Sequence, residues 1–194
     1  MGRDFIGNDV DLERVKVELI ESIVYQNYWD GHDPHIIGNY PDVFLVIGKI
    51  DDAYNRIINP VIEDIRNQTW DKYEFIRTEP CPLSLKVIEI DVSGGPRNLK
   101  TRDIVAPTQS NDDMITLYII KPYDAIMAMG EEMVKDFQRF VFSLMGVAFP
   151  ADNDRHTHAI ILSETDPEPE NYLNWFISDG ILQEIVLKEV NNNE

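Results

Sequence analysis

The sequence predicts a single α+β domain spanning residues 1–194, with N-terminal amphipathic helices, a small mostly antiparallel sheet and a packed third helix. Two patterns support this class. Apolar residues recur at helical spacing in the first third of the chain, and a two-residue period follows in the middle. The composition, with 43% hydrophobic and 27% charged residues, is ordinary for one folded domain of 194 residues.

The first helix is predicted over residues 9–29. Asn8 and Asp9 are typical capping residues, and apolar side chains then recur at three- and four-residue steps until Trp29. A turn-rich loop rich in glycine and proline follows at 30–41.

A second helix is predicted over residues 51–67, bent at Pro60, because its apolar residues continue at three- and four-residue steps. The segment in front of it, 42–48, leaves two interpretations open. Val43 to Ile47 fits a buried strand, and the same residues also extend the helical pattern backwards.

The remaining elements are predicted to be strands around one further helix. A two-residue apolar period predicts a strand at 83–92, which ends at the turn Ser93-Gly94-Gly95-Pro96. Residues 97–113 are polar and aperiodic and predict an extended loop or arm. The later predictions are strands at 115–120, 158–162 and 181–186, a helix at 127–144 and a short helix or turn at 168–177.

Charge is the most unusual property of the chain. Thirty-five acidic residues against seventeen basic ones give a net charge of -18, which predicts no tight binding to nucleic acid. The excess concentrates after Pro150, where ten residues are acidic and two are basic. The predicted acidic surface consists of Asp152, Asp154, Glu164, Asp166, Glu168 and Glu170.

Residues 164–170 alternate acids with prolines and predict an acidic, proline-rich loop. This loop has three interpretations: a solvated surface, a surface that imitates the phosphate spacing of DNA, or the lining of a channel through which DNA passes. The single cysteine, Cys81, excludes an internal disulfide, and no apolar stretch approaches the ~18 residues of a membrane span. We therefore expect a cytoplasmic protein with no membrane contact.

The histidines offer one candidate metal site. His156 and His158 would point to the same side of an extended strand and could share a metal with Asp152 or Asp154. The alternative is a pair of unligated histidines in an exposed polar loop. No catalytic motif of high specificity occurs in the chain, so we predict no catalytic residue and no cofactor.

Residues 51–70 (DDAYNRIINPVIEDIRNQTW), preceded by the helix at 9–29, resemble the opening of tailed-phage head-to-tail adaptor and tail-tube ring proteins. In that family a first helix is also followed by an amphipathic helix that ends in a tryptophan and passes into a β region. Pro60 inside the helix departs from this pattern. The alternative is an ordinary amphipathic core helix in which Trp70 covers the core.

The resemblance implies a non-enzymatic virion structural protein, an oligomeric neck or tail adaptor ring subunit with an acidic surface near the DNA path. Its partners would be further copies of itself and neighbouring virion proteins, and it would reach the virion after synthesis in the host cytoplasm. Residues 97–113 would contact neighbouring subunits, and the implied interface residues are Phe149, Trp175 and Phe176. The alternative for these three aromatic residues is packing in the core, which is their more frequent role.

Two alternatives come from other classes of protein. One is an acidic inhibitor or immunity protein that mimics DNA and binds a basic nucleic-acid enzyme. The other is a small metal-dependent hydrolase that uses His156 and His158.

Overall fold

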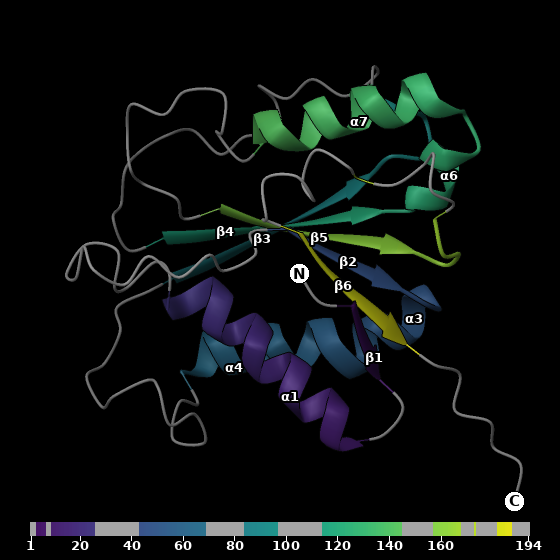
Figure 1. Ribbon diagram of the computed structural model, residues 1–194. Helices are drawn as coiled ribbons and strands as arrows, with labels where there is room; N and C mark the ends of the chain where they lie inside the picture. The colour runs from purple at the N-terminus through teal and green to yellow at the C-terminus, as the bar shows by residue number, and fades with distance from the viewer. Residues whose placement is uncertain are drawn as a thin grey trace, which may run out of the picture.

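The structure is a computed structural model that describes residues 3–6, 9–25, 43–68, 84–96, 114–144, 157–167, 173 and 182–187. Within these residues, six strands form one sheet with helices on both faces (Figure 1). In their order across the sheet, the strands are β1 (Arg3–Ile6), β6 (Leu182–Leu187), β2 (Val43–Ile47), β5 (Thr157–Ser163), β4 (Met114–Lys121) and β3 (Ser84–Asp91). Every neighbouring pair is parallel.

The predicted mostly antiparallel α+β fold is therefore wrong, and the chain is an α/β protein. Parallel neighbours need a crossover of about a dozen residues or more, and every connection between consecutive strands here is at least that long. The central strands also lack the alternation of a one-sided sheet. All five residues of β2 are buried, because helices cover both of its faces.

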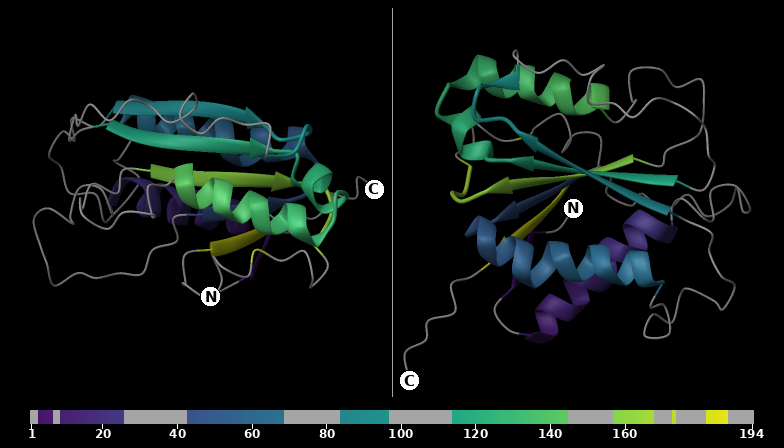
Figure 2. Two further views of the ribbon diagram at one scale, coloured as in Figure 1. Left: turned by 90° about the horizontal axis from the view of Figure 1, so that it is seen from above. Right: turned by 180° about the vertical axis from the view of Figure 1, so that it is seen from behind.

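The helices form two layers (Figure 2). One face carries α1 (Asp9–Ile20), which continues as the π-helical turn η1 (Glu21–Tyr25), and a continuous helix made of α3 (Ile50–Ala53), the π-helical turn η2 (Tyr54–Ile58) and α4 (Asn59–Asn67). The other face carries α6 (Tyr123–Met127) and α7 (Glu131–Leu144). Successive side chains of β2 point to opposite faces of the sheet. Phe44 packs in the core on the α1 and α4 side, and Leu45 packs in the core on the α7 side.

The placement of the helices follows the direction of each crossover. The connections from β1 to β2 and from β2 to β3 advance the same way along the sheet, and their helices α1 and α3 to α4 share a face. The connection from β4 to β5 runs the other way and places α6 and α7 on the opposite face. This is the arrangement that crossovers of one hand produce.

The structure decides the open interpretation of residues 42–48 in favour of a strand, β2. The helix after it runs from Ile50 to Asn67, close to the predicted span, and it continues through Pro60, as predicted for this helix. The irregularity is the π-helical turn η2, which directly precedes Asn59 and Pro60, the first two residues of α4. Sequence reasoning missed β1. The predicted arm at 97–113 lies outside the described residues.

In the described parts of the chain, no helix combines the length and the apolar character needed to cross a membrane.

Candidate functional site

The carboxyl edge of the sheet is the place where this architecture offers a site. In open parallel sheets, ligands bind outside the carboxyl ends of the strands, where two neighbouring strands lead to opposite faces. Here that point lies between β2 and β5. The chain leaves β2 into α3 on one face, whereas Leu173, which follows β5, packs in the core of the other face.

The connection from β2 to α3 consists of only Gly48 and Lys49. The Gly48 amide donates to the Ser163 carbonyl at the end of β5 over 2.8 Å. Gly48 has a φ of +148°, and a Cβ atom there would lie 2.8 Å from the Cβ of Leu187 in β6. The ends of β2, β5 and β6 therefore meet without space for an inserted group at this point.

This connection differs from a phosphate-binding loop. Such a loop supplies several backbone amides from a glycine-rich stretch between strand and helix, followed by Lys and then Ser or Thr. Here Gly48 and Lys49 lead directly to Ile50, which has no hydroxyl group. Asp51 and Asp52 occupy the first turn of the helix, so its N-terminus faces carboxylates of the same chain.

A second feature of the edge is the Asp124 cluster, made of Asp124 in α6 with Glu164 and Thr165 after β5. The Asp124 carboxylate accepts hydrogen bonds from the Glu164 amide (2.8 Å), the Thr165 amide (2.9 Å) and the Thr165 hydroxyl (2.6 Å). Burial alone would raise the pKa of Asp124, but these hydrogen bonds outweigh it and lower the pKa below its ordinary value. Two adjacent amides that could hold an external anion thus hold a carboxylate of the chain itself.

The third feature is the Lys121 cluster, which joins β3, β4 and η2. Lys121 Nζ donates to Tyr54 Oη (2.7 Å) and to Glu89 Oε2 (2.9 Å), and it lies 4.3 Å from the centroid of the Tyr54 ring. Burial opposes the charge of Lys121, but the two hydrogen bonds outweigh burial and raise its pKa. The hydrogen bond from Lys121 lowers the pKa of Glu89.

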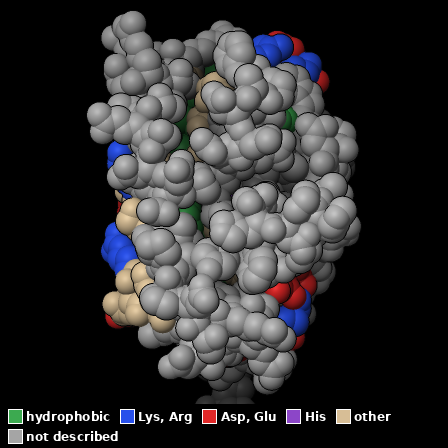
Figure 3. Space-filling view, turned by 90° about the vertical axis from the view of Figure 1, so that its left-hand side faces the viewer, with side chains coloured by type: hydrophobic (Ala, Val, Ile, Leu, Met, Phe, Trp, Pro, Cys, Tyr) green, Lys and Arg blue, Asp and Glu red, His purple; other side chains and the backbone are tan. Residues whose placement is uncertain are grey.

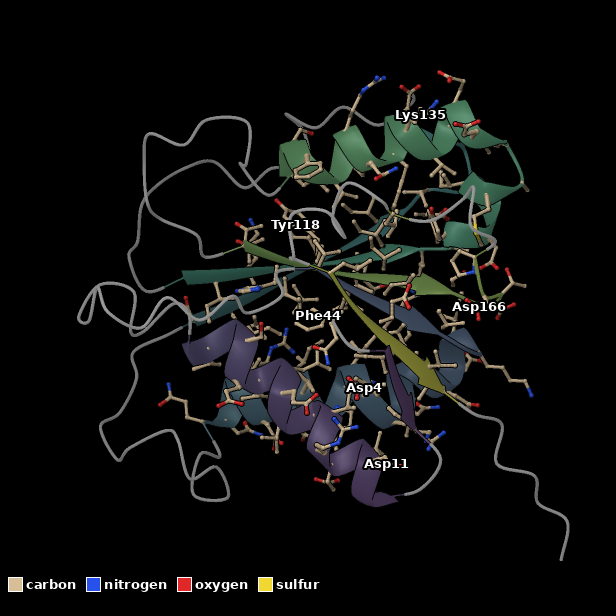
Figure 4. All side chains as sticks on the ribbon, viewed as in Figure 1. Asp4, Asp11, Phe44, Tyr118, Lys135 and Asp166 are labelled. Carbon is tan, nitrogen blue, oxygen red and sulfur yellow. The ribbon has the colours of Figure 1, made fainter. Side chains whose placement is uncertain are left out.

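Acids dominate the described part of this edge. The carboxylates there are Asp51, Asp52, Glu89, Asp91, Asp124, Glu164 and Asp166, whereas the lysines are Lys49 and Lys121. Figure 4 shows Asp166 at the end of the molecule where the strands lead into α3 and α6. Figure 3 views the opposite end, where described acidic and basic side chains lie beside one another at the margins. The carboxyl edge is therefore unfavourable for a phosphorylated ligand.

The structure places three of the residues selected from the sequence. Glu164 and Asp166 are exposed in the turn after β5. His158 lies in β5 opposite Leu117 of β4 and is fully buried, not in an exposed loop. The other selected residues lie outside the described parts of the chain: Phe149, Asp152, Asp154, His156, Glu168, Glu170, Trp175 and Phe176.

Among the residues that the structure does describe, no three His, Cys, Asp or Glu side chains are grouped to hold a metal ion. Sequence reasoning also missed Tyr54, Glu89, Lys121 and Asp124. Lys121 and Asp124 could have been found by taking the residues that follow the predicted strand 115–120, once the strands were known to be parallel. Glu89 lies within β3 and Tyr54 within η2, so that rule does not reach them.

The comparison with solved structures agrees with this architecture, whereas the other comparisons find no match. No protein-family profile and no curated protein matches the chain. Among solved structures, the chain is similar to C. elegans PCH-2, with a TM-score of 0.54 and 11% sequence identity. The shared feature is the overall fold alone. The likeness covers 90% of this chain and 43% of the PCH-2 chain, so this chain matches less than half of its neighbour's length.

Proposed function

We propose that this chain is a non-enzymatic interaction subunit that acts through protein contacts, without a bound nucleotide. The observation that carries the proposal is the two-residue connection at Gly48 and Lys49, which occupies the position of a phosphate-binding loop in a sheet of this architecture. Gly48 is bonded to Ser163 and packed against Leu187, so no loop of free amides is available there.

The electrostatics of the edge support the same proposal. A nucleotide triphosphate brings several negative charges, and the described edge would meet them with more carboxylates than lysines. Lys121 is already paired with Glu89, and the amides of Glu164 and Thr165 already hold Asp124. The chain thus satisfies internally the groups that would bind a phosphate.

The resemblance of residues 51–70 gives this proposal its specific form, an oligomeric ring subunit in the neck or tail of a phage. Its further support is the net charge of -18 and the exposure of Glu164 and Asp166. Acids at the wall of a channel repel DNA over about a Debye length, roughly 8 Å at physiological salt, which would let DNA pass without adhering.

Nucleotide binding tests the non-enzymatic part of the proposal. Titration of the protein with a fluorescent ATP analogue and Mg²⁺ is expected to give no saturable signal, and isothermal calorimetry with ATP no heat of binding. A double variant, Asp51→Asn with Asp52→Asn, is the matched control. It removes two charges without creating a loop, so it is also expected not to bind. Saturable binding by the natural chain that Lys49→Ala abolishes would contradict the proposal.

Light scattering coupled to size-exclusion chromatography tests the ring. The protein is measured over a range of concentrations, alone and mixed with candidate portal and tail proteins. We expect a closed oligomer in at least one of these mixtures. A monomer in all of them would remove the ring and leave the nucleotide result unaffected.

A further inference from the structure

We propose that Met129 is a site of reversible oxidation by hydrogen peroxide, and that its oxidation loosens the turn formed by residues 93–96. This inference is independent of the proposed function. It concerns the surface where the turn after β3 meets the corner between α6 and α7.

Among the residues that the structure describes, Met129 is the one large hydrophobic residue that is exposed, with 44% of its surface accessible. It lies in the α6–α7 corner, where its amide donates to the Ile126 carbonyl over 3.1 Å. Gly130, with a φ of +92°, then turns the chain towards α7. The backbone of Met129 is therefore fixed while nearly half of the residue's surface is open to solvent.

The thioether covers one residue of the turn. Gly95 is buried, with a φ of +83°, and a Cβ atom there would lie 3.3 Å from the sulfur of Met129 and 3.7 Å from the sulfur of Met133. Hydrogen bonds hold the turn itself. The Gly95 amide donates to the Val92 carbonyl (2.9 Å), and the Ser93 amide donates to the Asp91 carboxylate (2.8 Å).

The chemistry requires only peroxide and an accessible sulfur. The sulfur of Met129 attacks one oxygen of hydrogen peroxide, an S–O bond forms as the O–O bond breaks, and water leaves after proton transfer. The sulfur loses two electrons, and the product is methionine sulfoxide. The sulfoxide is polar and chiral and packs poorly against the buried backbone of Gly95, so it is expected to turn into solvent. Reductases that act on methionine sulfoxide would reverse the change.

Limited treatment with hydrogen peroxide, followed by peptide mass spectrometry, tests the site. Met129 is expected to gain one oxygen before Met127 and Met133, which are less exposed. Hydrogen exchange of the oxidised protein is then expected to be faster at the Gly95 amide, with little change in the strands of the sheet. Treatment with methionine sulfoxide reductases should restore the original exchange rate.

Two conservative variants complete the test, because Leu and Met have similar volumes and either protein should fold. Met129→Leu is expected to keep slow exchange at Gly95 after peroxide treatment, whereas Met133→Leu should respond as the natural chain does. The proposal is overturned if Met127 or Met133 is oxidised first, or if oxidation at Met129 leaves the exchange of Gly95 unchanged.

Discussion

Gly48 connects three strands at one point, because its amide binds the end of β5 and its α-carbon packs against β6. Gly48→Ala introduces both a strained backbone and a Cβ contact of 2.8 Å with Leu187. The strain alone costs about 1–3 kcal/mol of unfolding free energy, and we expect the contact to add to it. Urea denaturation followed by circular dichroism measures the loss.

Gly130→Ala provides the matched control for this substitution. Gly130 also has a positive φ, but a Cβ atom there would have no neighbour within 4 Å. The Gly130 variant should therefore lose less stability than the Gly48 variant. Equal losses in the two proteins would show that Gly48 is constrained by its backbone angle alone.

Asp124 is expected to contribute to stability in a pH-dependent way. Its folded pKa is lowered, so its contribution is present above the unfolded pKa and is lost as the pH falls through the folded pKa. Asp124→Asn should lower the unfolding free energy by about 1–2 kcal/mol near neutral pH, since charged hydrogen bonds are lost. The variant should also show a flatter decline of stability in acid, measured by thermal unfolding over a pH series.

Glu164→Gln tests the side chain of Glu164 separately from its backbone amide, which donates to Asp124. Its exposed carboxylate is replaced while the amide that binds Asp124 remains. A change within about 0.5 kcal/mol is expected. If Glu164→Gln is as destabilising as Asp124→Asn, the Asp124 cluster does not explain the acid sensitivity.

The end of α4 carries a strained residue. Gln68 has φ 50° and ψ 45°, the left-handed conformation of a helix C-terminus that glycine adopts most readily. Gln68→Gly should therefore stabilise the protein by up to about 1 kcal/mol. The strain that glycine relieves in the left-handed conformation exceeds the free-energy cost of the greater entropy it gives the unfolded chain. Gln68→Ala keeps a Cβ atom and should give no such gain when the two variants are compared by denaturation.

The sequence predicts the elements of this fold better than their arrangement. Local periodicity depends on neighbouring residues, so the apolar patterns of the second helix and of the last strands lie within a residue or so of α3 to α4, β5 and β6. The direction in which strands pair depends on crossovers between distant residues, and no local period reports it. β1 has only four residues, too few to show a period.

The candidate site escaped prediction for the same reason. Lys121 and Glu89 meet only because β3 and β4 are parallel and end at one edge, and Tyr54 reaches them from a helix on one face. Asp124 and Thr165 lie forty-one positions apart in the sequence. Local sequence features such as the histidine pair or the acidic loop do not show which distant residues come together in the fold.

At the scale of the whole molecule, repulsion among carboxylates is expected to limit stability. With thirty-five acidic and seventeen basic residues, repulsive pairs outnumber attractive ones. Exposed ion pairs such as Arg14 with Asp4 and Glu18 contribute only about 0.2–1 kcal/mol each. Screening should therefore remove more repulsion than attraction.

The melting temperature is accordingly expected to rise between about 10 mM and about 1 M sodium chloride, as the Debye length falls from about 30 Å to about 3 Å. Differential scanning calorimetry at constant pH measures the change, and potassium chloride should give the same curve. A melting temperature that falls with salt would mean that attractive pairs dominate the surface.

The position of β6 between β1 and β2 has a consequence for synthesis on the ribosome. β1 is translated before residues 182–187, the strand it pairs with, and β2 to β5 are all translated between the two. During elongation β1 must therefore remain without this partner while β2 to β5 can already assemble. A nascent chain arrested before residue 182 would have an open edge on β2, where chaperones or a second nascent chain could pair with it.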